Sequence, residues 1–249
     1  MLGKLIKSVK NQSYKNWRLT FIDGPSTKEH KSYLKMICNN DDRFSFVEQN
    51  KNRKYIFGAM NQGFKLAKLD EWILFMGSDD WIASKDVFQS IDKRLNNYLK
   101  KNRMPDLLLG EATYVNYLNN NLGRKSKYLE FLNFRLSMFL GASLPHQATL
   151  IGPKARKKIN SYEEEITLSA DLDYFLKLSK KKDTKILNIN ENFVFIGQGG
   201  VSGRNVLERI KQVLICYYKN FKLLFFIPFF LRYSLRIFDF IKKFFRRIN

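Results

Sequence analysis

Residues 72–76 constrain the fold of this chain more than any other stretch. These five consecutive apolar residues have the pattern of a strand that is buried on both faces. In a chain that also contains helices, such a strand is typical of a parallel sheet. Gly77 and Ser78 end the run, and Asp79 and Asp80 follow directly. The sequence therefore predicts two neighbouring carboxylates at the carboxyl end of a core strand.

This position and this residue type together indicate a ligand site. Ligands of open α/β sheets bind beyond the carboxyl ends of the strands. Neighbouring carboxylates repel each other, so a cation shared with another negative group stabilises them. Hard oxygen ligands suit Mg²⁺ or Mn²⁺, which keep several waters and share a substrate phosphate. We therefore predict a metal–diphosphate site at Asp79 and Asp80, with an ordinary solvated turn before a helix as the alternative.

Short strands alternate with longer helical segments along the chain. Period-two or continuous apolar runs predict strands at residues 18–22, 44–47, 107–109, 112–117, 148–151, 186–189 and 193–196. Apolar residues at helical spacing predict helices at residues 2–9, 27–37, 55–67, 87–99 and 128–140, and another that begins after Ser169. The alternation predicts an α/β domain with a mostly parallel sheet flanked by helices.

Charge and cysteine content limit which partners and which cellular compartment the sequence predicts. The 249 residues carry 44 basic and 23 acidic side chains, a net charge of +21. Such an excess predicts a polyanionic partner, either nucleic acid or an anionic bilayer. Cys38 and Cys216 form neither a disulfide framework nor a zinc-binding spacing, which indicates a reducing cytosolic setting.

The last 44 residues differ in composition from the rest. Residues 206–249 hold nine Phe and ten Lys or Arg but only two acids. On a helical wheel, one arc of about 100° collects the charged residues Arg232, Arg236, Asp239, Lys243, Arg246 and Arg247. A wide apolar arc opposite a cationic stripe is typical of a helix that lies in a bilayer interface. The alternative is a helix packed on the domain with a solvated basic face. Nucleic-acid binding is disfavoured, because no recognised module is present.

Several motifs, taken in order, resemble one known family. They are residues 8–14, Phe21-Ile-Asp23-Gly, residues 59–67, Gly77-Ser-Asp-Asp-Trp81, His146-Gln147, Ala170-Asp171-Leu-Asp173 and Gly199-Gly-Val-Ser202. Together they resemble the family 2 glycosyltransferases of the GT-A fold, in the bacterial branch that builds cell-surface polysaccharides. The resemblance covers roughly residues 2–205 and rests on the order and spacing of the motifs.

The chain also departs from the family pattern. Residues 25–29 replace the usual Gly-Ser-Thr-Asp-Gly, and Gly58 stands where an Asp usually precedes Ala-Met-Asn. The family's first strand and its nucleotide-contacting loop would precede residue 1. We therefore expect an N-terminally truncated form of a Rossmann-like GT-A domain whose first strand is missing.

The resemblance implies metal-dependent, inverting transfer of a sugar from a nucleotide-sugar donor to a saccharide acceptor, which in this branch is expected to be lipid-linked. It assigns Asp80 as the ligand of Mn²⁺ or Mg²⁺ and Asp79 to the metal or the ribose. Asp23 would contact the base or ribose, although an Asx-turn role explains it equally well.

His146 and Gln147 would lie near the acceptor or diphosphate, and a lone His beside Pro is otherwise a loop or packing residue. Asp171 is preferred to Asp173 as general base, although the helix dipole also favours acids in a first turn.

These expectations divide the chain into two regions and leave two alternative functions open. Residues 1–205 are expected to form the glycosyltransferase domain, and residues 206–249 a membrane-surface extension. The protein would be cytoplasmic and peripheral on the inner face of the cell membrane, with no nucleic-acid partner. The alternatives are a catalytically inactive, truncated glycosyltransferase-like binding protein and a basic nucleic-acid-binding protein.

Overall fold

The computed structural model of the chain describes residues 2–53, 55–101, 103–116, 121–124, 132–197 and 205–234. The helices are α1 (Leu2–Lys10), α2 (Lys28–Asn39), α3 (Tyr55–Leu66), α4 (Val87–Leu99), α5 (Phe134–Phe139), α6 (Pro153–Lys158), α7 (Ala170–Ser179) and α9 (Val206–Phe221). The strands are β1 (Leu19–Asp23), β2 (Phe44–Glu48), β3 (Trp81–Ile82), β4 (Leu107–Val115), β5 (Asn121–Arg124), β6 (Thr149–Ile151) and β7 (Ile186–Gly197). The motif at residues 199–202 and the tail beyond residue 234 lie outside the described residues.

The strands form two sheets. β1 and β2 pair in parallel as a two-stranded sheet, while the larger sheet has the order β3-β7-β4-β5, with β6 also paired to β4. Within the larger sheet β4 and β7 run parallel, and the pairs β3/β7, β4/β5 and β4/β6 are antiparallel. The expected α/β class is confirmed. One parallel pair, β1/β2, forms a separate sheet, and the other, β4/β7, lies within a mixed sheet.

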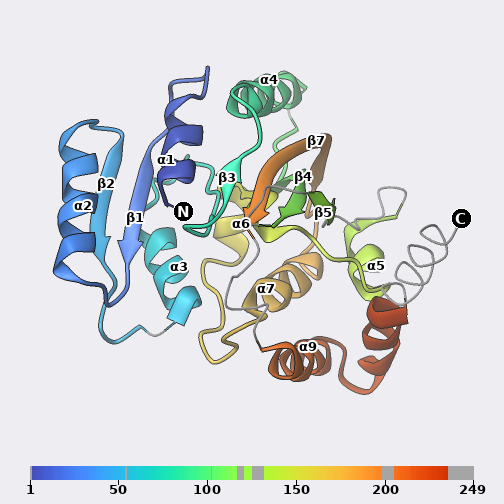
Figure 1. Cartoon of the computed structure of the whole chain (residues 1–249). Helices are drawn as coiled ribbons and strands as arrows, with labels where there is room; N and C mark the ends of the chain where they lie inside the picture. The colour runs from blue at the N-terminus through green and yellow to red at the C-terminus, as the bar shows by residue number, and fades with distance from the viewer. Residues whose placement is uncertain are drawn as a thin grey trace, which may run out of the picture.

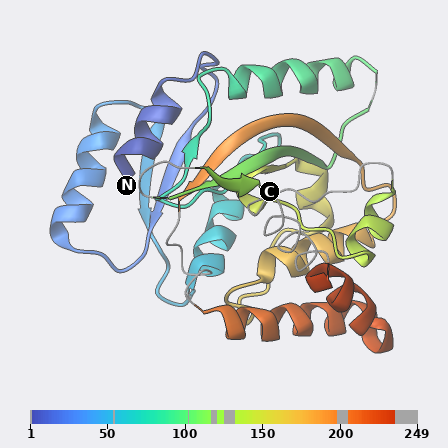
Figure 2. The same cartoon turned by 45° about the vertical axis from the view of Figure 1, so that its right-hand side comes forward.

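Helices cover both faces of the larger sheet. Figure 1 shows α4 above the sheet, α7 below it and α9 beyond α7, while α2, β1 and β2 lie to one side. The turned view in Figure 2 shows β4 and β7 as one curved layer beneath α4. Alternate side chains of β4 point to opposite faces. Leu107 and Leu109 pack in the core that contains α7, whereas Leu108 packs in the core that contains Val87 and Ile91 of α4.

The two longest strands are continuous where the sequence pattern predicts interruptions. Residues 107–109 and 112–117 were expected as separate strands, yet β4 runs through Gly110, with register shifts against β7 on either side of Glu111. Residues 186–189 and 193–196 likewise belong to the single strand β7. The long pairing between β4 and β7 is the reason, because it holds both strands extended through residues of low strand propensity such as Gly110.

The prediction of a strand at residues 72–76 needs a correction. This segment makes one isolated antiparallel bridge, between Ile73 and Ile151, rather than a ladder in a parallel sheet. Its side chains still alternate: Ile73 and Phe75 pack against the α7 core, and Trp72, Leu74 and Met76 against the α4 core. Within the described residues, β6 is the strand that this bridge reaches, and β6 forms its own three-residue ladder with β4. The apolar pattern therefore indicates partial burial on two faces, and not strand pairing.

The tail begins with a helix that belongs to the main core. Val213, Cys216 and Tyr217 of α9 are buried in the same cluster as α7. Further along, Arg232 donates from Nη1 to the Ala142 carbonyl and from Nη2 to Ser143 Oγ, both at 3.2 Å. This member of the predicted cationic stripe therefore faces the protein, while its other members lie outside the described residues. Among the described helices, none is long and apolar enough to cross a membrane.

Candidate active site

Asp79 and Asp80 form a tight turn at the end of residues 72–76. Asp80 is only 2% exposed, and its Oδ2 accepts a hydrogen bond from the Gly77 amide at 2.8 Å. A Cβ placed on Gly77 would lie 2.7 Å from Asp79 Oδ1 and 3.1 Å from Asp80 Oδ2. The two carboxylates therefore fold over the same glycine, and the absence of a side chain at Gly77 makes this approach possible. The predicted convergence of two carboxylates is present in the structure.

The carboxyl end of β7 packs against this turn. A Cβ on Gly197 would lie 2.5 Å from the Asp79 carbonyl oxygen. Two residues before Gly77, Phe75 stacks on His146, with ring centroids 5.9 Å apart and planes 6° apart. The apolar segment thus places the carboxylate pair and His146 in one neighbourhood, although 66 residues of chain separate Asp80 from His146.

His146 is part of a buried aromatic cluster. It lies in a short 3₁₀ turn (His146–Ala148) and is 5% exposed, with its Nε2 2.8 Å from the Tyr162 hydroxyl. Burial, reinforced by electrostatic interaction with Tyr174 and by the negative charge of Asp171, raises the pKa of Tyr162 well above its ordinary value. The Tyr162 phenol is therefore protonated at neutral pH and available for this hydrogen bond. Gln147, the next residue, is half-buried.

Sequence reasoning missed Tyr162 and the residue that positions it. The Asn61 side chain of α3 pairs with the backbone of Tyr162: Nδ2 donates to the Tyr162 carbonyl at 3.0 Å, and Oδ1 accepts from the Tyr162 amide at 2.7 Å. Asn61 is 3% exposed and lies between the buried Phe57 and Phe64. The available signal was a polar residue on the apolar face of a predicted helix, which requires a buried hydrogen-bond partner.

The two acids at the start of α7 have different surroundings. Asp173 is 1% exposed, lies 2.6 Å from Lys177 Nζ and accepts a hydrogen bond from Asn220 Nδ2 at 2.9 Å. Asp171 is half-buried, and within the described part of the chain no hydrogen bond or ion pair engages its carboxylate. Its charge raises the pKa of Tyr162, the partner of His146. Asp173 thus has a structural partner, whereas Asp171 retains a carboxylate available to a ligand.

Asp23 lies in a separate cluster at the end of β1. Its Oδ2 accepts a hydrogen bond from Ser26 Oγ at 2.5 Å, and its Oδ1 is 3.6 Å from His30 Nε2. The Ser26 contact links two side chains across the turn that leads to α2. It is not an Asx-turn, because Pro25, two residues after Asp23, has no backbone N–H to donate. The neighbouring Ile22 and Phe75 both approach Gly63 of α3, so β1 and the carboxylate-bearing segment pack on the same helix. The structure places Asp79 and Asp80 side by side, connects their segment to His146 through the ring of Phe75, and leaves Asp23 on the adjoining β1.

Comparison with known sequences identifies the family. Residues 1–139 match the sequence model of the family described as glycosyl transferase family 2. The chain belongs to glycosyl transferase family 2. The resemblance expected from the motifs is confirmed for the half of the chain that contains Asp23, Asp79 and Asp80.

A relative in sequence agrees with this membership, and solved structures show the fold. The family 2 chain is 26% identical over 216 residues to the Escherichia coli UDP-Glc:α-D-GlcNAc-diphosphoundecaprenol β-1,3-glucosyltransferase WfgD, with 83% of this chain and 76% of that protein covered. The crystal structure of S. aureus TarS 1–349 with UDP-GlcNAc superimposes with a TM-score of 0.65 at 14% identity, covering 88% of this chain and 62% of TarS 1–349. The mannosyltransferase PcManGT from Pyrobaculum calidifontis, solved with GDP-Man and Mn²⁺, gives a TM-score of 0.58 at 12% identity, covering 92% and 65%. These structures establish the GT-A fold.

Some matches are partial. A Campylobacter jejuni GalNAc(5)-diNAcBac-PP-undecaprenol β-1,3-glucosyltransferase is 26% identical over 98 residues, which are 39% of this family 2 chain and 31% of that protein.

The carboxylate pair of this family 2 chain fits a divalent metal ion. Asp79 and Asp80 supply hard oxygen donors on one side of Gly77. Among the described residues, no group of three or more His, Cys, Asp or Glu side chains could hold a metal. A pair of carboxylates suits Mg²⁺ or Mn²⁺, which complete their shell with water and phosphate oxygens, and does not suit a closed structural zinc site.

Proposed function

We propose that this chain transfers a sugar from a nucleotide-sugar donor to a saccharide acceptor. The observation that carries the proposal is the fold of Asp79 and Asp80 over Gly77, linked through Phe75 and His146 to Tyr162, whose pKa the charge of Asp171 raises. A cation-binding pair and an available carboxylate in one neighbourhood are what activation of a diphosphate leaving group and of an acceptor hydroxyl require.

Asp80 and Asp79 are proposed to bind the donor end. Their carboxylates would hold Mn²⁺ or Mg²⁺, which neutralises charge on the departing nucleoside diphosphate without proton transfer. The hydrogen bond from the Gly77 amide fixes the orientation of the Asp80 carboxylate. Asp23 is proposed to accept a hydrogen bond from the base or ribose of the same donor. The nucleotide sugar and Mn²⁺ in the structures of relatives support these assignments.

Asp171 is proposed to act as general base at the acceptor end. It takes the proton of an acceptor hydroxyl while the hydroxyl oxygen forms a bond to the anomeric carbon and the bond from that carbon to the diphosphate breaks. A single displacement of this kind inverts the anomeric configuration. His146, held by Tyr162, and Gln147 are proposed to orient the acceptor or the diphosphate.

The acceptor is proposed to be lipid-linked and the protein to act at the inner face of the cell membrane. The name of the E. coli relative supports a lipid diphosphate acceptor. The exposed face of α9 and the residues after it carry Leu207 and Leu223, which are 84% and 85% exposed, beside exposed Lys211, Lys219 and Lys222. Apolar side chains interspersed with cations suit the interface of an anionic bilayer. We therefore propose residues 1–205 as the catalytic region and residues 206–249 as the attachment region.

The test is donor turnover by the purified chain. The protein is incubated with a panel of UDP- and GDP-sugars, with and without Mn²⁺, and the released nucleoside diphosphate is quantified. We expect metal-dependent release that Asp80→Asn lowers at least about 100-fold, since a lost electrostatic contact to the transition state costs about 10²–10³ in rate. Asp86→Asn is the matched control, because Asp86 is exposed and its side chain makes no cap hydrogen bond.

Two outcomes would contradict the proposal. Release that Asp80→Asn leaves unchanged would remove Asp80 from the metal site. Donor binding without turnover, under all metals and acceptors of the panel, would favour the inactive binding protein.

A further inference from the structure

A cavity of about 510 Å³ lies between α1 and the segment that follows the carboxylate pair. Residues 81–85 form one wall, and Lys4, Lys7 and Asn11 of α1 form the opposite wall. Phe195 of β7 and Val115 of β4 complete the lining. Because Trp81 follows Asp80 directly in the chain, the cavity begins beside the proposed reaction centre. None of the roles assigned above uses it.

Buried hydrogen bonds hold the two walls together. The Gln12 side chain is fully buried; it donates from Nε2 to the Ser84 carbonyl at 2.7 Å and accepts from the Phe88 amide at 3.0 Å. The Ile82 amide donates to Ser8 Oγ at 3.0 Å, which joins β3 to α1. A cavity with walls fixed in this way is formed before a ligand arrives, which lowers the entropic cost of binding.

The lining combines aromatic faces with positive charge. The rings of Trp81 and Phe195 are 5.7 Å apart with planes inclined by 36°, and Lys4 Nζ lies 4.7 Å from the centre of the Trp81 ring. Lys7 and Lys85 are exposed, and within the described residues no carboxylate lies in ion-pairing distance of either. The lining contains three lysines and no acidic residue. A ligand for this cavity therefore needs an apolar face and negative charge.

We propose that this cavity is a subsite for an acidic saccharide, namely a segment of the acceptor glycan that carries a carboxylate or phosphate. The C–H face of a sugar ring packs on the indole, and the anionic group accepts charge-assisted hydrogen bonds from the lysines. This inference rests on the proposed transfer reaction and names the substrate class that its acceptor belongs to. The position of the cavity favours glycan over lipid diphosphate, because α1 and α9 lie on different sides of the molecule in both views (Figures 1 and 2).

Equilibrium binding tests the subsite without catalysis. The full chain carrying Asp80→Asn is titrated with a trisaccharide of uronic acids and with a neutral trisaccharide of the same linkage, by calorimetry at low and moderate salt. We expect the acidic sugar to bind at least tenfold more tightly, with an advantage that shrinks as salt screens the lysines. Lys7→Glu with Lys85→Glu should weaken binding of the acidic sugar at least tenfold and leave binding of the neutral sugar unchanged.

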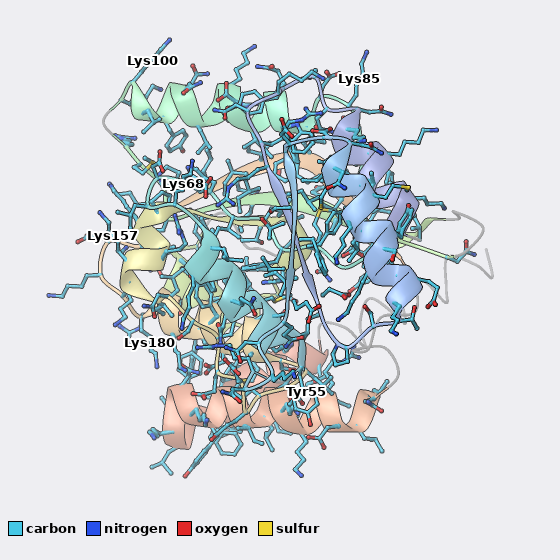
Figure 3. All side chains as sticks on the ribbon, turned by 90° about the vertical axis from the view of Figure 1, so that its left-hand side faces the viewer. Tyr55, Lys68, Lys85, Lys100, Lys157 and Lys180 are labelled. Atoms are coloured by element: carbon cyan, nitrogen blue, oxygen red, sulfur yellow. The ribbon has the colours of Figure 1, made fainter. Side chains whose placement is uncertain are left out.

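A second charge reversal separates a specific subsite from general attraction to a basic protein. Lys100→Glu with Lys157→Glu changes the net charge by the same amount, at exposed positions that Figure 3 shows well apart from Lys85. Equal weakening by both double variants would overturn the proposal, as would equal affinity for acidic and neutral sugars. Tighter binding of single-stranded RNA or of farnesyl diphosphate than of the acidic sugar, with the same loss in the Lys7 and Lys85 variant, would also overturn it. Donor turnover is measured separately, so a failure of the transfer reaction and a failure of the subsite give different results.

Discussion

At the scale of single residues, Asp171 and Asp173 show how two acids of one helical turn can differ. Asp173 is buried between Lys177 and Asn220, and its carboxylate is satisfied by both. Asp171 has no such contact among the described residues and lies close enough to Tyr162 to raise its pKa. This difference indicates that the Asp173 carboxylate stabilises the fold and that the Asp171 carboxylate is available for catalysis.

We expect Asp171→Asn to lower the turnover number by about 10²–10⁴, the range that a general base contributes, without weakening donor binding. Asp173→Asn should instead lower the free energy of unfolding by about 1–3 kcal/mol, because it weakens a buried polar network. Steady-state kinetics and thermal melting of both variants measure the two effects. If Asp171→Asn keeps its rate within about threefold of the parent protein, Asp171 is not the base.

At the scale of secondary-structure elements, the parallel pair β4/β7 depends on a glycine. A Cβ on Gly110 would lie 2.1 Å from Cδ2 of Phe193, a ring that is fully buried on β7. The ring therefore occupies the space that a side chain at position 110 would need. This contact accounts for a residue of low strand propensity in the middle of the longest pairing of the sheet.

Gly110→Ala should lower the free energy of unfolding by about 1–3 kcal/mol or more, since overpacking forces the ring or the backbone to move. Gly3→Ala is the matched control: nothing lies within 4 Å of a Cβ there, and alanine in a helix gains up to about 1 kcal/mol over glycine. Urea unfolding midpoints compare the two variants. An unchanged midpoint for Gly110→Ala would show that β4 and β7 can separate without loss of stability.

At the scale of the whole molecule, positive charge and exposed apolar side chains meet around α9. Phe225, Phe229 and Tyr233 pack against the main core, while Leu223 and Phe230 are 85% and 70% exposed. Truncation at residue 221 would remove both the packed and the exposed side chains. A loss of membrane binding could then not be distinguished from a loss of stability. Point substitutions of the exposed side chains avoid this problem.

Leu223→Ser with Phe230→Ser should lower partitioning onto anionic vesicles at least tenfold, because each buried apolar side chain contributes about 1.5–3 kcal/mol. Leu69→Ser is the control, since Leu69 is also 85% exposed but lies in the loop before residue 72. Vesicle sedimentation at two salt concentrations measures the partition. Equal sedimentation of the double variant and the parent protein would refute attachment through this surface.

The sequence by itself determined the features that depend on neighbours along the chain. Apolar spacing predicted the bounds of α1, α3 and α4 within a few residues, because the residues on one face of a helix recur every three or four positions along the chain. The position of Asp79 and Asp80 directly after an apolar segment was likewise local, and so was the prediction that residues 72–76 have two apolar faces.

Tertiary structure decided what depends on residues far apart in the chain. Residues 72–76 meet β6 in a single bridge, β4 pairs with β7 along most of its length, and Gly110 of β4 packs against Phe193 of β7. The pairing of Asn61 with Tyr162 joins positions 101 residues apart, and Asn220 reaches Asp173 from a different helix. No periodicity encodes such contacts, because they arise only when the packed elements bring a donor within reach of an acceptor that burial has removed from water.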